Sequence, residues 1–164
     1  MFASAPFLSL YMLSRSNPPF SIAVEKTSSK RAVGHYVIDP SRQKAVKAGP
    51  EERVRQSAIS FLHDEIGVPL GLISVEKQIE KANTEYRADI VVYARDGKPW
   101  MIIECKAPTV KLTQAAFDQV GKYNRVVLAR YLMITNGEHH YCCSWDVQNK
   151  KVSYLDEFPS YPNP

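Results

Sequence analysis

Two carboxylates and a lysine lie on either side of a short turn signal in this sequence. Asp89 precedes the turn, and Glu104 and Lys106 follow it with one residue between them. Carboxylate oxygens are ligands that favour Mg²⁺ or Mn²⁺ over zinc. A cation held by the pair would polarise a phosphate and lower the pKa of a water molecule, and Lys106 could orient that water and stabilise developing negative charge. The three residues therefore predict metal-dependent hydrolysis of a phosphodiester.

The turn itself is Asp96-Gly97, a strong signal for a two-residue hairpin loop between two apolar strands. With these two residues alone in the loop, counting outward places Asp89 directly opposite Glu104. Directly opposed Cβ atoms are ~4.5–5.5 Å apart, and residues two apart on a strand share a face. The sequence therefore predicts that both carboxylates and Lys106 lie together on one face of the hairpin.

The carboxylate pair is predicted to lie among apolar side chains. These neighbours are Ile90, Val91, Val92, Met101, Ile102 and Ile103. Two carboxylates in such surroundings repel each other and are poorly solvated, and a divalent cation would offset both costs. The structural alternative stays open: Asp89 at a strand edge, and Glu104 in an ordinary ion pair with Lys106 or Arg87.

Several basic residues lie on or near a helix predicted at 113–129. They are Lys111, Lys122, Arg125 and Arg130. They could contact phosphates and give affinity without sequence information, although a solvated helix face explains them equally well. The formal net charge of +4 is compatible with a nucleic-acid partner but does not demonstrate one.

A second group of potential metal ligands lies near the C-terminus and consists of His139, His140, Cys142 and Cys143. Alternate residues of a strand face opposite ways, so His139 and Cys143 could converge but all four could not. The spacing matches no standard structural zinc pattern. We therefore interpret the segment as an ordinary strand and keep a zinc site as the alternative.

The site residues need a sheet and helices to position them. Pro50-Glu51-Glu52 is a good helix opening, because proline suits the first helical position and acidic residues favour the positive end of the helix dipole. Apolar residues continue at helical spacing to Ile66, and Gly67 is a plausible stop. A short apolar run at 36–38 precedes this helix. Strands are predicted at 72–79, 87–94, 100–105, 131–135, 139–145 and 152–155.

This order of elements predicts an α/β (α+β) fold with a mixed central sheet flanked by helices. We place a single domain at 35–158 and a tail at 159–164. Residues 1–34 contain Ser, Pro and scattered apolar residues without a clean period. They are interpreted as an irregular or partly disordered extension.

The cellular compartment is indicated by the cysteines and by the apolar segments. The sequence has three cysteines, two of them adjacent, which indicates reduced thiols rather than a disulfide framework. No apolar run approaches the ~20 residues that span a bilayer. The apolar start, 1–13, lacks a basic flank and is a poor signal peptide. We therefore expect a cytoplasmic protein without a membrane partner.

A family resemblance rests on several pieces in a fixed order. The segment RADIVVYARDGKPWMIIECKAP resembles the PD-(D/E)XK nuclease core, with Arg-Ala-Asp in place of Pro-Asp. More narrowly, about two thirds of the chain, 38–141, resembles the N-terminal nuclease domain of type I restriction enzyme R subunits. The further matching pieces are IDPSRQKAVKAGPEERVRQ and the segment TQAAFDQVGKYN followed by YLMITNGEHHY.

This resemblance implies a restriction-endonuclease-like fold with the core order αβββαβ, here with a C-terminal β-hairpin extension. It also implies Mg²⁺- or Mn²⁺-dependent cleavage of DNA. By match of position, Asp89 and Glu104 would be metal ligands together with the backbone carbonyl of Cys105, and Lys106 would be the catalytic lysine.

An acidic residue on the first helix often completes such sites. Glu52 is our choice and Glu51 the next, and a helix-start charge effect is the alternative for both. Gln119 and Tyr123 fit a Gln-x-x-x-Tyr motif that resembles those of RecB-like nucleases. Gln119 could orient the lysine or a phosphate and Tyr123 could contact the DNA backbone, whereas a polar helix stripe is the alternative.

The chain departs from an R subunit in having no Gly-x-x-x-x-Gly-Lys-Ser/Thr loop, and so no ATP site or helicase motor is expected. A catalytically silent nucleic-acid-binding or assembly module that keeps the fold is therefore the alternative to an active nuclease. A homodimer or a larger restriction-type assembly is compatible with either reading.

Overall fold

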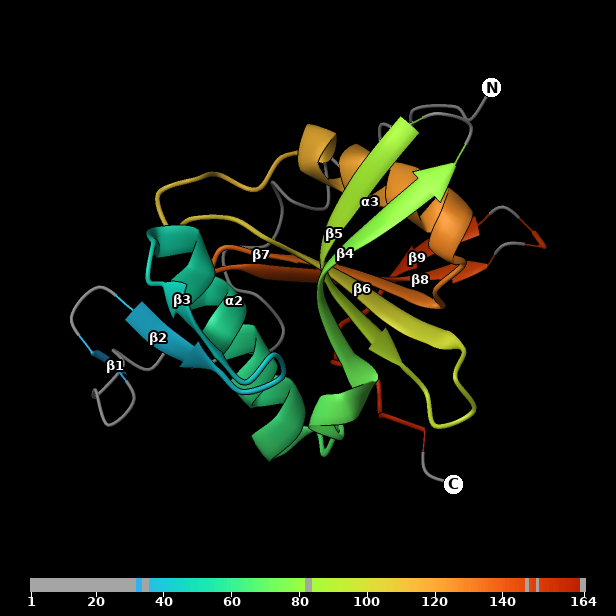
Figure 1. Cartoon of the computed structure of the whole chain (residues 1–164). Coiled ribbons are helices and arrows are strands. Elements are labelled where there is room, and N and C mark those ends of the chain that lie inside the picture. Colours follow the sequence, from blue (N-terminus) through green and yellow to red (C-terminus); the bar gives the residue numbers. More distant parts are fainter. Residues whose placement is uncertain (1–31, 34–35, 82–83, 147, 150, 163–164) are drawn as a thin grey trace.

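The computed structural model describes residues 32–33, 36–81, 84–146, 148–149 and 151–162. Within this part the elements follow one another from a small sheet to a large one (Figure 1). They are β1 (Ala32–Val33), β2 (Tyr36–Asp39), β3 (Lys44–Lys47), α2 (Pro50–Ser60), β4 (Ile73–Lys81), β5 (Thr84–Tyr93), β6 (Pro99–Cys105), α3 (Gln114–Val127), β7 (Tyr131–Thr135), β8 (His140–Asp146) and β9 (Lys151–Tyr154).

The larger sheet has six strands in sequence order, from β4 to β9. All neighbouring strands are antiparallel except β6 and β7, which are parallel because α3 connects them. The order of α2, three strands, α3 and β7 confirms the predicted αβββαβ core with a mixed sheet. Strands β8 and β9 form the predicted C-terminal hairpin.

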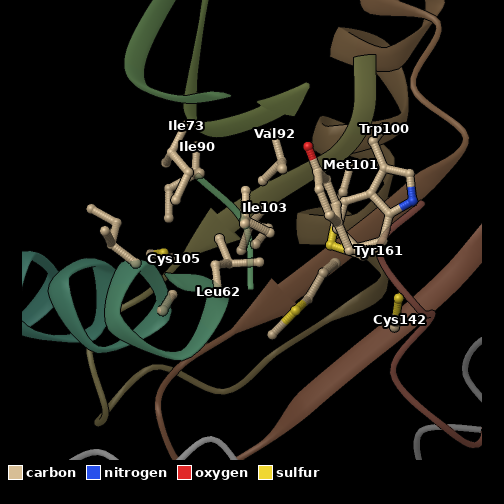
Figure 2. Packing of buried hydrophobic residues seen from close by; sticks show 14 of the residues in the cluster. Leu62, Ile73, Ile90, Val92, Trp100, Met101, Ile103, Cys105, Cys142 and Tyr161 are labelled. Carbon is tan, nitrogen blue, oxygen red and sulfur yellow. The ribbon is translucent and has the colours of Figure 1, made fainter. Parts of the chain in front are cut away.

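The two helices cover opposite faces of this sheet (Figure 1). Helix α2 contributes Val54, Ala58 and Ile59 to one apolar cluster, and the π-helical turn that follows it contributes Leu62. This cluster also holds Ile90, Met101 and Ile103 from the strands (Figure 2). Helix α3 contributes Phe117, Val120 and Tyr123 to the other, with Val91, Ile102 and Leu132. The near-continuous apolar runs of β5 and β6 are explained by this burial on both faces.

The loop between β5 and β6 differs from the prediction. It has three residues, 95–97, because Ala94 N–H donates to Lys98 O at 2.8 Å and Gly97 N–H donates to Ala94 O at 2.9 Å. Gly97 has a φ of +80°, which suits the last position of a three-residue loop. This loop pairs Tyr93 with Pro99, one residue away from the predicted register.

An irregularity between Val92 and Tyr93 restores the predicted register closer to the site. Val92 pairs with Met101, and Ile90 pairs with Ile103, as predicted from a two-residue loop. The predicted two-residue loop was therefore wrong. The predicted register holds from Val92–Met101 to Ile90–Ile103, where the ladder ends, so the predicted pair of Asp89 with Glu104 is not part of it. The bulge exists because both apolar faces must remain buried, and a one-residue slip would exchange them.

The small sheet of β1, β2 and β3 is joined to α2 by a buried aspartate. Asp39 is fully buried and closes the turn after β2, where it accepts hydrogen bonds from Ser41 N at 2.9 Å and Arg42 N at 2.9 Å. Gln56 of α2 donates to the same carboxylate at 3.0 Å. Burial acts to raise the pKa of Asp39, but the hydrogen bonds from the Arg42 backbone, Ser41 and Gln56 together lower it below its ordinary value. Strand β3 was not predicted, because KAVK carries little apolar alternation.

The ends of the fold also differ from the predicted boundaries. After Ser60, α2 continues as a π-helical turn, Phe61–Glu65, so the helical segment ends close to the predicted Gly67 stop. Tyr161, in the predicted tail, packs against Trp100 with ring centroids 5.2 Å apart (Figure 2). Its hydroxyl donates a hydrogen bond to Tyr93 O at 2.8 Å. The predicted extension lies outside the described residues except for β1.

Candidate active site

Asp89 lies on β5 where the ladder between β5 and β6 ends. The last pair of that ladder is Ile90 with Ile103. Beyond it, Oδ2 of Asp89 accepts a hydrogen bond from the backbone N–H of Cys105 at 2.7 Å, and Oδ1 accepts one from Nη2 of Arg55 at 2.8 Å. The carboxylate of Asp89 therefore takes the place of the next backbone contact between the two strands.

Glu104 and Lys106 form an ion pair, with Nζ of Lys106 2.6 Å from Oε1 of Glu104. Glu104 is buried, with 4% of its surface exposed. Burial raises the pKa of Glu104, and the nearby Asp89 carboxylate raises it further, against the effect of Lys106. Burial alone would lower the pKa of Lys106, but the hydrogen bond to Glu104 gives a net rise. The lysine is therefore held in its charged form.

The backbone opposite Asp89 is unusual. Val75 pairs with Ile90 and Lys77 with Ala88, and so Glu76 lies across from Asp89 on β4. Glu76 has a φ of 51°, in the left-handed region that non-glycine residues rarely adopt. Ile90 faces α2 whereas Ala88, two residues away, faces α3. The alternation of faces reverses at this point, which explains how the Asp89 side chain reaches Arg55 of α2.

Arg55 links Asp89 to the start of α2. Its side chain is 5% exposed. Besides Asp89 it contacts Glu52 through Nη1, Glu51 at 3.5 Å and Glu76 at 4.0 Å. The surrounding carboxylates raise the pKa of Arg55 above its ordinary value despite burial, so the guanidinium is charged.

The predicted first-helix carboxylate, Glu52, is therefore joined to Asp89 through an arginine. Its Oε1 also accepts hydrogen bonds from Gln56 at 2.8 Å and from Arg42 at 3.3 Å. Arg42 further pairs with Glu76 at 2.5 Å. The alternative residue, Glu51, is the more exposed of the two, at 49% of its side chain.

Gln119 and Tyr123 share one face of α3, as their spacing predicts. Nε2 of Gln119 donates to the Tyr123 hydroxyl at 2.5 Å, and Tyr123 is buried in the apolar cluster below α3. Within the part of the chain that the structure describes, no hydrogen bond joins Gln119 to Lys106. The predicted DNA-contacting residues Lys111, Lys122 and Arg125 are exposed.

The His/Cys segment has a structural role in β8. Cys142 packs on the α2 side of the sheet and Cys143 on the α3 side, so their thiols point apart. His140 is buried and pairs through Nδ1 with the Thr135 hydroxyl at 2.7 Å, and burial lowers its pKa to about 4. This geometry gives no support to the alternative of a zinc site.

Asp89 and Glu104 retain acceptor capacity for one hard cation. Oε2 of Glu104 is buried and has no hydrogen-bond partner among the described residues. Each Asp89 oxygen accepts one of the hydrogen bonds above, and a carboxylate oxygen has two acceptor positions. No group of three or more His, Cys, Asp and Glu residues in the described ranges is arranged to hold a metal. Mg²⁺, which binds through one or two carboxylates and keeps several waters, fits this donor set.

Sequence reasoning missed three residues of this network, Arg42, Arg55 and Glu76. Arg55 had a detectable signal, because it occupies a position on the apolar stripe of α2 together with Ala58 and Leu62. A charged residue on a buried stripe needs a partner. Glu76 had no such signal, because its left-handed backbone follows from contacts that are remote in sequence.

Comparison with known proteins decides the family. Residues 50–159 match the family described as type I restriction enzyme R protein N terminus. The chain belongs to this family. The match begins at the first residue of α2 and includes every residue of the predicted site, from Glu51 to Arg125.

Among solved structures, the chain is similar to the fragment structure of a protein designated an HsdR subunit of a type I restriction enzyme, from Vibrio vulnificus. The two are 19% identical with a TM-score of 0.47, and the match covers 67% of this chain and 23% of that chain. No curated protein matches the chain. None of the helices among the described residues is long and apolar enough to cross a membrane.

Proposed function

We propose that this domain is a Mg²⁺- or Mn²⁺-dependent nuclease that hydrolyses phosphodiester bonds of DNA. The observation that carries the proposal is the state of Glu104. Lys106 holds one of its oxygens, and the other is buried without a hydrogen-bond partner among the described residues. The charge of Asp89 is near enough to contribute to the raised pKa of Glu104, after burial. Leaving a buried charged oxygen unpaired costs more than an ordinary hydrogen bond is worth. A cation shared with Asp89 would remove that cost.

The division of work follows from the contacts of each residue. Asp89 and Glu104 would hold the cation, with the backbone carbonyl of Cys105 as a further ligand. When bound, the cation would polarise the scissile phosphate and make water a better nucleophile. Lys106 keeps its proton in the ion pair with Glu104, and its ammonium would orient the attacking water and stabilise negative charge that develops on the phosphate.

DNA would be held by residues outside the carboxylate pair. Lys111, Lys122 and Arg125 are exposed along and before α3 and would contact phosphates. Gln119 would position a phosphate or Lys106 after leaving its bond to Tyr123, and Tyr123 would contact the DNA backbone. Membership of the R protein family supports a restriction-type assembly as the setting for this activity.

The test is cleavage of supercoiled plasmid and single-stranded DNA in Mg²⁺ or Mn²⁺. Wild type should cleave, and Asp89→Ala and Lys106→Ala should not. Lys151→Ala is the matched control because Lys151 is exposed on β9, distant in the sheet from β5 and β6. Equal cleavage by the wild type and by both site variants would remove these residues from the reaction.

A catalytically silent DNA-binding or assembly module is the second candidate. It is favoured by one contact, the bond from Arg55 to Oδ1 of Asp89, which already supplies that carboxylate with a cationic partner. This candidate predicts salt-dependent DNA binding by wild type without cleavage in either metal. Metal-dependent cleavage that is lost in Asp89→Ala would exclude it.

A further inference from the structure

Arg55 occupies a position at which carboxylates from three elements meet. Glu51 and Glu52 come from α2, Glu76 from β4 and Asp89 from β5, and all four lie within 4.0 Å of the guanidinium. The Arg55 and Asp89 side chains are each exposed by less than a tenth. Charges so little exposed gain little from water and depend on the opposite charges around them.

Other side chains hold two of these carboxylates in place, and the Arg55 side chain is buried. Glu52 is held by Gln56 and Arg42, and Glu76 is held by Arg42 and by Arg87 at 3.5 Å. The left-handed backbone of Glu76 costs on the order of 1–3 kcal/mol and persists only where surrounding contacts impose it. Among the described residues, Arg55 is therefore the cation that contacts all four carboxylates, and Arg42 and Arg87 hold two of them, Glu52 and Glu76.

The unpaired oxygen of the proposed site lies outside this group of four carboxylates. Arg55 bonds Oδ1 of Asp89, whereas the partnerless oxygen is Oε2 of Glu104. The two halves of the acidic region therefore differ. Toward α2, Arg55 contacts all of the carboxylates, whereas toward Glu104 the ammonium of Lys106 contacts Oε1 and leaves Oε2 without a hydrogen-bond partner among the described residues.

We propose that Arg55 is a positioning residue that takes the place of a second divalent cation, so that the domain binds one such ion, on Asp89 and Glu104. This inference rests on the proposed function. In this arrangement the guanidinium of Arg55 neutralises Glu52 and Asp89 and fixes the Asp89 carboxylate. A merely structural arginine would have no effect on the number of ions bound.

The experiment counts Mn²⁺ ions bound by the full chain, by isothermal titration and by electron paramagnetic resonance of free Mn²⁺. Wild type should bind one ion, and Asp89→Asn and Glu104→Gln should lose it. Arg55→Met, which removes the charge and keeps the stem of the side chain, should bind two. The double variant Arg55→Met/Glu52→Gln should return to one, because the second ion would need the Glu52 carboxylate.

Two further variants distinguish the effect of the lost Arg55 charge on ion binding from an effect on folding. Arg55→Lys keeps the charge and should bind one ion. Arg53→Met, at the exposed neighbouring arginine, should behave as wild type. If Arg55→Met is unfolded without metal, Mn²⁺ should restore its circular dichroism spectrum and raise its Tm by more than it raises that of wild type, because each bound ion stabilises the folded state.

Several results would overturn the proposal. They are two ions on wild type, one ion of unchanged affinity on Arg55→Met, or an Arg55→Met variant that Mn²⁺ cannot refold. A wild type whose Mn²⁺ binding is absent, or is unaffected by both Asp89→Asn and Glu104→Gln, would instead count against the proposed function. A failure of this inference and a failure of the proposed function therefore give different results in one set of titrations.

Discussion

The carboxylate of Asp89 is bonded to the backbone N–H of Cys105 at 2.7 Å, and Cys105 lies between Glu104 and Lys106. The bond forms where the ladder between β5 and β6 has ended. It thereby fixes the Asp89 carboxylate relative to the segment that carries Glu104 and Lys106. The site residues are thus held together by a contact between the Asp89 side chain and the Cys105 backbone.

Lys106→Met should reduce Mn²⁺-supported DNA cleavage by about 100-fold or more, the range expected when a positioned proton-transfer or charge-stabilising group is lost. Methionine keeps the stem of the side chain but removes the ammonium that lies 2.6 Å from Glu104. Initial rates at saturating Mn²⁺ measure the effect. Lys98→Met is the control, because Lys98 directly follows the β5–β6 loop and its side chain is 83% exposed. A Lys106→Met rate close to the control rate would contradict the assigned role.

Glu104→Gln should change the pH dependence of stability. The pKa of Glu104 is raised above its ordinary value of 4.5 by burial and by Asp89, so the folded protein keeps this proton to a higher pH than the unfolded chain does. The contribution of Glu104 to the free energy of unfolding therefore falls as pH rises from about 4.5 through the raised pKa. Glutamine does not titrate, and the stability of the variant relative to wild type should rise over that interval.

Urea unfolding between pH 4 and 8 without divalent cations measures this difference. A difference between Glu104→Gln and wild type that stays constant with pH would be inconsistent with a raised pKa. Added Mn²⁺ should reduce the pH dependence of wild type, since a bound cation favours the charged carboxylate.

Glu76→Gly should be more stable than Glu76→Ala by about 1 kcal/mol, because only glycine adopts a left-handed backbone without cost. Both variants lose the same ion pairs with Arg42 and Arg87, so their difference isolates the φ of 51°. Urea midpoints of the two variants give the comparison.

The neighbouring Lys77 provides the control for the Glu76 variants. Lys77 is exposed, is on the same strand and is not among the residues with positive φ. There the usual order in a strand should hold, with Lys77→Gly less stable than Lys77→Ala by about 0.5–1 kcal/mol. The same order at both positions would show that the Glu76 backbone is not strained.

Lys122→Ala should weaken DNA binding and make the dependence of log K on log salt less steep by about 1, because one phosphate contact releases about one counterion. Fluorescence anisotropy on a short duplex without divalent cations measures this slope. Lys151→Ala, exposed on β9, is the control and should keep the wild-type slope. An unchanged slope in Lys122→Ala would remove this lysine from the DNA contacts.

The sequence predicted those parts of the fold that depend on local patterns. The apolar runs of β5, β6 and β7 and the proline and acidic start of α2 gave the core order. The ion pair between Glu104 and Lys106 was expected only as the structural alternative to a metal site. The predicted pairing of Asp89 directly opposite Glu104 was not found, because the ladder between β5 and β6 ends at Ile90 and Ile103. The charge of Asp89 nevertheless acts on both Glu104 and Lys106.

The parts that could not be predicted depend on contacts between remote segments. The reversal of faces at Glu76 and Asp89 requires a left-handed residue that no local sequence signal indicates. The role of Arg42 arises from the docking of the small sheet on α2, because Arg42 touches Glu52 and Glu76 only in the folded chain. A pattern of single residues cannot specify such a network.

The coupling between the β5–β6 loop and the irregularity after Val92 constrains how this region can change length. Deleting one loop residue, such as Arg95, gives a two-residue loop that is already in register with Ile90 and Ile103, so the irregularity would become unnecessary. An insertion without a second change nearby would displace Glu104 and Lys106 along the sheet. Insertions and deletions in the loop are therefore expected to arise in descendants of this sequence together with compensating changes around Val92.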